Sequence, residues 1–71
     1  MAIPINNRFG QRVRQLRKDR GWSQEEYAER CSLDRTYISG IERGVRNPSL
    51  EVLENLARGF DLSLSEMMDG V

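Results

Sequence analysis

The chain has 71 residues, which is long enough for one domain and too short for a second. Its 11 Lys and Arg residues balance 11 Asp and Glu residues, and it contains one cysteine and no histidine. An internal disulfide is therefore excluded, and so few catalytic or metal-binding groups are present that we expect neither an enzyme nor a metal or cofactor site. No apolar run approaches the roughly 20 residues of a membrane-spanning helix, and no signal peptide is evident, so we expect a soluble cytoplasmic protein.

Charge is unevenly distributed along this neutral chain. Residues 1–20 carry six basic side chains against Asp19, whereas residues 51–71 carry Arg58 against five acidic side chains. A chain polarised in this way can present a cationic face to phosphate groups while its acidic end stays away from them. Because basic helices are also common as ordinary solvated faces, the charge pattern permits nucleic-acid binding without indicating it.

Two helices are predicted in the first half of the chain. Asn6 or Asn7 can act as the N-cap of the first helix, and Gly21 ends it. Ser23, with Glu26 three residues later, forms the capping-box pattern that starts the second helix. The apolar residues at helical spacing, which we expect to be buried, are Phe9, Val13 and Leu16 in the first helix and Tyr27, Ala28 and Cys31 in the second.

Two or three further helices are predicted after a tight turn at residues 31–34. Asp34 can cap a third helix that ends at Gly44, and Asn47 or Ser49 can cap a fourth. A last short helical turn is expected from Ser63. The expected buried residues are Ile38, Ile41, Leu50, Leu53, Leu56, Ala57 and Phe60. No strand-like alternation occurs, so the sequence predicts an all-α, compact bundle of four or five short helices.

The second and third predicted helices, at residues 23–43, have the spacing of a helix-turn-helix that fits the major groove of DNA. An ordinary helical hairpin packed in a core would have similar spacing. The third helix differs from such a hairpin because only Ile38 and Ile41 form its buried side. The other side consists of polar or small residues: Arg35, Thr36, Ser39, Gly40 and Arg43. Arg, Thr and Ser are side chains that contact base edges or phosphates.

Gly40 stands inside the predicted third helix, where glycine costs about 1 kcal/mol relative to alanine. In one interpretation, the missing side chain allows the helix backbone to lie close to base pairs. In the other, Gly40 allows close approach of a neighbouring helix. Both interpretations remain open at this point.

Four segments, residues 21–26, 28–29, 35–44 and 46–49, closely resemble the Cro/C1-type (XRE-family) helix-turn-helix domain. The resemblance covers about residues 9–68, and residues 33–43 are most similar to controller proteins of restriction–modification systems. It implies a single lambda repressor-like domain over residues 1–71 that binds a symmetric double-stranded DNA operator as a homodimer. The implied function is a transcriptional regulator of its own and neighbouring genes, with no membrane association and no small-molecule effector.

The resemblance also implies roles for individual residues. The base-reading set is Arg35, Thr36, Tyr37 and Ser39, to which the unusual helix glycine adds Gly40. The set expected at the DNA backbone or minor groove is Arg17, Gln24, Arg43, Arg46 and Asn47. Arg17 and Glu42 match a family ion pair that ties the first helix to the third, and Ala28 matches the small residue at a helix crossing.

Three features depart from the family pattern. Ser32 stands where the family turn usually has glycine, and a left-handed backbone there would cost about 1 kcal/mol. Asp61 stands where glycine often ends the fourth helix. Trp22 and Tyr27 replace aliphatic residues, which we interpret as core packing.

The acidic C-terminal part, at about residues 50–70, is the predicted dimerisation end. Its apolar residues are more numerous than a small monomer can easily cover: Val52, Leu62, Leu64, Met67 and Met68. The alternative is that they close the monomer core. An antitoxin or another protein-interaction module would also use such an end, and a phage-type repressor would share the DNA chemistry in another circuit.

Overall fold

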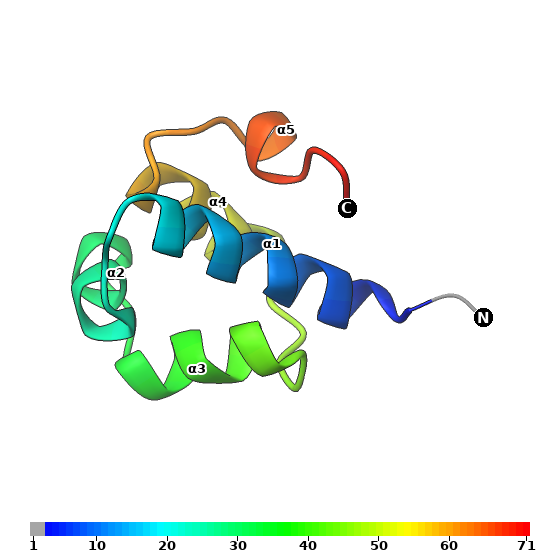
Figure 1. The fold of residues 1–71 in the computed structure, drawn as a ribbon, viewed down its shortest axis with the longest axis horizontal. Coiled ribbons are helices and arrows are strands. Elements are labelled where there is room, and N and C mark those ends of the chain that lie inside the picture. The colour runs from blue at the N-terminus through cyan, green and yellow to red at the C-terminus, as the bar shows by residue number, and fades with distance from the viewer. Residues whose placement is uncertain (1–2) are drawn as a thin grey trace.

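The computed structural model describes residues 3–71, and every regular element in that part of the chain is an α-helix. The helices are α1 (Ile5–Asp19), α2 (Gln24–Cys31), α3 (Arg35–Arg43), α4 (Leu50–Gly59) and α5 (Leu64–Met67). α3 and α5 lie on opposite sides of α1 (Figure 1). The expected all-α bundle of short helices is therefore confirmed. None of the helices over residues 3–71 has the length and apolar character needed to cross a membrane.

Side-chain caps fix where most helices begin. Ser23 Oγ accepts from the Glu26 amide at 3.0 Å while the Glu26 carboxylate accepts from the Ser23 amide at 2.9 Å, as the capping-box pattern predicts. Because the hydrogen bond from the Ser23 amide favours the ionised carboxylate, it lowers the pKa of Glu26. Ser63 and Glu66 form an equivalent box at α5. Asp34 caps α3, and of the two candidates for α4 the cap is Ser49.

The expected cap of α1 was wrong. Asn6 and Asn7 lie inside this helix, which begins at Ile5 with Pro4 as its N-cap and no side-chain cap. The carbonyl of Pro4 instead accepts hydrogen bonds from the amides of Asn7 at 3.0 Å and Arg8 at 3.1 Å, which starts the helix without a capping side chain. Proline is tolerated at this position because its missing N–H is not needed for a hydrogen bond within the helix.

Ser32 and Asp61 both adopt left-handed backbone conformations, with φ of 58° and 60°. Each follows a helix and turns the chain so that the next residue, Leu33 or Leu62, packs against the core. The amide of Leu33 donates to the carbonyl of Ala28 at 2.9 Å, and that of Leu62 donates to Ala57 at 3.0 Å. These hydrogen bonds and apolar contacts offset the cost of a left-handed non-glycine residue.

The core contains residues from all five helices and includes an aromatic stack. The ring centroids of Tyr27 and Phe60 are 4.1 Å apart, and those of Trp22 and Phe60 are 6.1 Å apart, with each pair of rings stacked. The hydroxyl of Tyr27 donates to the Leu56 carbonyl at 2.7 Å, and burial raises its pKa. The buried residues are Phe9, Val13, Leu16, Tyr27, Ala28, Cys31, Ile38, Ile41, Leu56, Ala57, Phe60 and Met67. The interpretation of the aromatic departures as core packing is therefore confirmed.

Two expectations about buried residues were wrong. Leu50 is 79% exposed because it is the first residue of α4 and extends beyond the helices that cover the rest of that face. Met67, expected at a dimer interface, is 0% exposed and belongs to the monomer core. It is inaccessible to a partner unless α5 moves.

Arginines of α1 hold the C-terminal segment in place. Arg12 donates to the carbonyls of Met67 at 3.0 Å and Glu66 at 2.9 Å, and Arg8 Nε donates to the Val71 carbonyl at 3.2 Å. α5 has only four residues and would not be a stable helix by itself. Its position therefore depends on these hydrogen bonds from α1, on its packing against α4 and on the burial of Met67 in the core.

Gly10 allows α1 to lie directly against the backbone of α3. A Cβ atom added at Gly10 would lie 2.8 Å from the carbonyl oxygen of Glu42 and would also collide with that of Ile41. Backbone atoms cannot move aside as a flexible side chain can. The absence of a side chain at Gly10 thus sets the distance between the two helices.

We predict that Gly10→Ala lowers the free energy of unfolding by about 1–3 kcal/mol through overpacking, although alanine is the better helix former. Chemical denaturation followed by circular dichroism measures this change. Gly40→Ala is the matched control, because its added Cβ would meet only the flexible side chain of Arg46. A Gly10→Ala protein as stable as the wild type would contradict the close helix contact.

Candidate nucleic-acid interface

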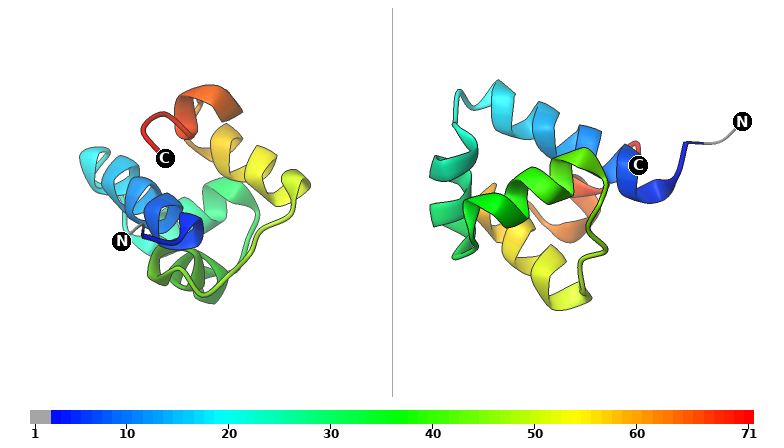
Figure 2. Two further views of the ribbon diagram at one scale, coloured as in Figure 1. Left: turned by 90° about the vertical axis from the view of Figure 1, so that its right-hand side faces the viewer. Right: turned by 90° about the horizontal axis from the view of Figure 1, so that it is seen from below.

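α2 and α3 form a helix-turn-helix whose second helix has one uncovered face. Ile38 and Ile41 point into the core and fix the orientation of α3. Seen from below, α3 lies in front of the other helices (Figure 2, right). We call its outer surface the α3 face, formed by Arg35, Thr36, Tyr37, Ser39 and Arg43. A helix of this length with such a face can enter the major groove of DNA.

The expected DNA-contacting residues differ in their exposure. Arg35, Thr36, Arg43, Arg46 and Asn47 are exposed, and Gln24, Tyr37 and Ser39 are half-buried. The exposed residues lie on α3 and on the loop that follows it. The α3 face and the loop are therefore brought together on one side of the molecule, which matches their expected common role.

Asp34 organises the first turn of α3. Its carboxylate accepts from the backbone amide and from the hydroxyl of Thr36, both at 3.0 Å. These hydrogen bonds hold the pKa of Asp34 below its usual range. The hydroxyl of Thr36 has therefore used its single hydrogen and can only accept hydrogen bonds from a partner.

Neither interpretation of Gly40 describes its surroundings. Gly40 is buried, and a Cβ added there would lie 2.8 Å from Cγ and 3.0 Å from Nε of Arg46. The guanidinium carbon of Arg46 lies 5.3 Å from the centre of the Tyr37 ring. Gly40 therefore neither presents bare backbone to base pairs nor contacts another helix, and its place in the base-reading set is corrected.

Arg17 and Glu42 join α1 to α3 through two hydrogen bonds. Arg17 Nε lies 2.6 Å from Glu42 Oε2, and Nη2 lies 3.0 Å from Oε1. Their side chains are only 11% and 5% exposed, and the hydrogen bonds to Glu42 raise the pKa of Arg17. Arg17 Nη1 also donates to the Trp22 carbonyl at 2.8 Å. Most donors of Arg17 are thus engaged within the fold, which leaves little of it for a DNA phosphate.

Gln24 extends this ion pair to α2. Its side-chain amide donates to Glu42 Oε1 at 3.2 Å. Glu42 therefore accepts hydrogen bonds from both α1 and α2 while it stands near the end of α3. We call these three side chains the Glu42 junction; it fixes the orientation of α3 relative to both neighbouring helices.

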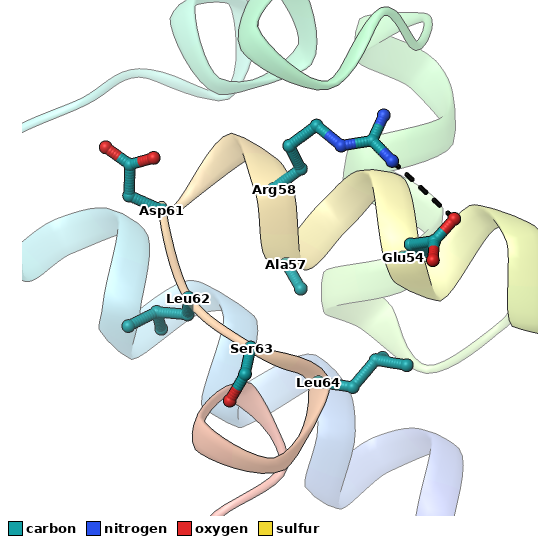
Figure 3. A pocket seen from close by; sticks show the side chains of 7 residues that line it. All are labelled: Glu54, Ala57, Arg58, Asp61, Leu62, Ser63 and Leu64. Carbon is teal, nitrogen blue, oxygen red and sulfur yellow. Dashed lines mark ion pairs between the residues drawn. The ribbon is translucent and has the colours of Figure 1, made fainter.

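The residues expected at a dimer interface do not form a single exposed patch. Val52, Leu62 and Met68 are half-buried against the core, and Leu64 is 37% exposed. Figure 3 shows the groove between α4 and segment 61–64, where the Leu62 and Leu64 side chains point in different directions. Leu50, which the sequence interpretation placed in the core, adds an exposed apolar side chain at the start of α4.

The described residues contain few groups suited to catalysis. Over residues 3–71 no cluster of three or more His, Cys, Asp or Glu side chains is arranged to hold a metal ion. Cys31 is buried, and burial raises the pKa of its thiol, which makes it a poor nucleophile at neutral pH.

Comparison with known proteins relates the whole chain to transcription regulators. The profile of the family "Helix-turn-helix" matches residues 13–67. The chain is 44% identical to the control protein C.MunI of a Mycoplasma species over 68 residues, which are 94% of this chain and 92% of that protein. It is 45% identical to the control protein C.BamHI of Bacillus amyloliquefaciens, over 97% of this chain and 86% of that protein.

A solved structure shares the fold. The restriction–modification controller protein C.AhdI from Aeromonas hydrophila superimposes with a TM-score of 0.85 at 44% identity, over 89% of this chain and 96% of that one. The chain is therefore similar to these controller proteins over nearly the full length of each.

We predict that Arg17 and Glu42 are energetically coupled. Removing either partner leaves a largely buried unpaired charge, so Arg17→Ala and Glu42→Ala should each cost about 3 kcal/mol or more of stability. A double-mutant cycle measured by chemical denaturation should give a coupling energy of about 1–3 kcal/mol.

The exposed pair Glu54–Arg58, at 3.6 Å, is the matched control for this cycle. Its side chains are 64% and 70% exposed, so solvent screening should limit its coupling to about 0.5 kcal/mol or less. Equal coupling energies in the two pairs would contradict a special role for the Glu42 junction.

Proposed function

Because this chain belongs to the Helix-turn-helix family of DNA-binding transcription regulators, we propose that it is a controller protein that binds a symmetric operator as a homodimer. In this role it regulates its own gene and neighbouring genes. The observation that carries the proposal is the uncovered α3 face, held in orientation by the Glu42 junction.

The proposed DNA contacts follow from the exposure of side chains on and after α3. Arg35 and Thr36 stand in its first turn, the part of a recognition helix that reaches base edges. Tyr37 and Ser39 continue this base-reading surface. The proposed contacts to the DNA backbone or the adjacent minor groove come from Gln24, Arg43, Arg46 and Asn47.

The proposed dimer uses the groove between α4 and α5 together with the exposed apolar side chains beside it. Leu64 is the main candidate contact because it is the most exposed of the expected interface residues. Leu62 lines the same groove, whereas Val52 and Met68 are half-buried outside it and would contribute at the edges of the interface. A two-fold dimer would place its recognition helices about 34 Å apart, which is one turn of DNA.

We predict that the protein binds the DNA upstream of its own gene and that Arg35→Ala loses about 1–3 kcal/mol of affinity for that site only. Arg43→Ala should weaken binding to specific and random DNA alike, because phosphates carry no sequence. Fluorescence anisotropy with labelled duplexes measures both affinities.

Arg30→Ala is the control for the removal of one positive charge, since Arg30 is an exposed residue of α2 whose guanidinium lies over Trp22, outside both the α3 face and the groove proposed for the dimer. It should leave both affinities unchanged. Equal losses on specific and random DNA for Arg35→Ala would assign Arg35 to the DNA backbone. Absence of any DNA binding by the wild type would contradict the proposal and favour a protein-interaction module such as an antitoxin.

We predict that the wild type sediments as a dimer at micromolar concentration and that Leu64→Glu sediments as a monomer, because a buried unpaired carboxylate opposes association. Val45→Glu is the control, since Val45 is also an exposed apolar residue but belongs to the loop after α3. Figure 1 shows the end of α3, where this loop begins, and α5 on opposite sides of α1. A wild type that stays monomeric with and without operator DNA would exclude the dimer.

A further inference from the structure

Gly40 lies beneath the side chain of Arg46, and this contact joins α3 to the loop that follows it. We infer that Gly40 is a positioning residue for Arg46: it leaves room for the arginine side chain to cross α3 and to place its guanidinium beside Tyr37. This inference rests on the proposed DNA-binding function and assigns a cause to the position of one of its contact residues.

The loop after α3 folds back over the helix that it has just left. Gly44 turns the chain with φ of 77°, and the amide of Val45 donates to the Gly40 carbonyl at 3.0 Å. Arg46 therefore starts beside the last turn of α3, and its side chain runs back along the helix. Tyr37 and Gly40 are three residues apart and share one side of α3, so a side chain crossing Gly40 reaches the Tyr37 ring.

The space above Gly40 is filled by Arg46. The three atoms nearest to an added Cβ are all from this side chain: Cγ at 2.8 Å, Nε at 3.0 Å and Cδ at 3.4 Å. An alanine at this position would displace the arginine stem, which is flexible, and would not collide with a backbone. The fold itself would accept alanine at position 40. The path of the Arg46 side chain, in contrast, requires glycine there.

A fixed path has a consequence for binding. An exposed arginine samples many rotamers, and a partner that orders it must overcome that loss of freedom. Packing across Gly40 and the cation–π contact with Tyr37 restrict Arg46 before any partner arrives. The Arg46 guanidinium is thereby held next to the α3 face and samples fewer positions in the solvent.

The first test concerns the free protein and does not depend on DNA. In the wild type, the ring current of Tyr37 should shift the NMR signals of the Arg46 side chain upfield. In Gly40→Ala these signals should return to the values of an unrestrained arginine, while the melting temperature stays equal or rises because alanine favours the helix. Unchanged Arg46 signals in Gly40→Ala would overturn the inference.

The second test compares operator binding of Gly40→Ala, Arg46→Ala and the double variant. Gly40→Ala and Arg46→Ala should each lose about tenfold in affinity, and each should lower the slope of log affinity against log salt by about 1. The double variant should bind no more weakly than Arg46→Ala, because Gly40 acts through Arg46. Additive losses, or a Gly40→Ala protein that binds as well as or better than the wild type, would overturn the inference.

The two tests separate this inference from the proposed function. A wild type that binds no DNA would overturn the proposed function and, with it, the role of Gly40 in DNA binding. The NMR signals of the free protein would still decide whether Gly40 positions the Arg46 side chain.

Discussion

The Glu42 junction is the interaction on which the arrangement of the DNA-binding unit depends. One carboxylate accepts hydrogen bonds from Arg17 of α1 and Gln24 of α2 while it belongs to α3. A carboxylate with so little exposure would be costly without these partners. The same contacts that satisfy its charge also determine the direction in which α3 points. The Glu42 side chain therefore both stabilises the fold and orients the helix that is proposed to contact DNA.

The α3 face can remain polar because other parts of the molecule supply the apolar contacts. Ile38 and Ile41, together with the partly buried Tyr37, attach this helix to the core. The aromatic stack of Tyr27 and Phe60 comes from α2 and from the end of α4. A domain of this size buries only a small apolar core, so its stability is marginal. It can leave one helix face polar and exposed only if the rest of the core is well packed. Stacked aromatic rings provide that density, since each ring buries a large apolar area.

Features fixed by neighbouring residues in the chain were predictable from the sequence, and those fixed by distant contacts were not. The caps at Ser23 and Asp34 and the buried positions of α1 to α3 follow from local patterns. Gly10 gives no local signal, because only the carbonyl oxygens of α3 explain it. Periodicity identified the buried side of α4 but not where the covering helices end, so Leu50 was misplaced. The path of Arg46 over Gly40 depends on a flexible side chain that no spacing rule describes.

The contacts of α1 have a consequence for the geometry of the proposed dimer. On one side this helix lies against α3 through Gly10, and on the other its Arg8 and Arg12 hold the segment that contains α5. α1 thus connects the surface proposed to contact DNA with the surface proposed to contact a second copy. The orientation of α1 between these two surfaces would then help to set the distance between the two recognition helices. Insertion of a single base pair between the half-sites would shift and rotate one half-site away from the recognition helix that α1 positions.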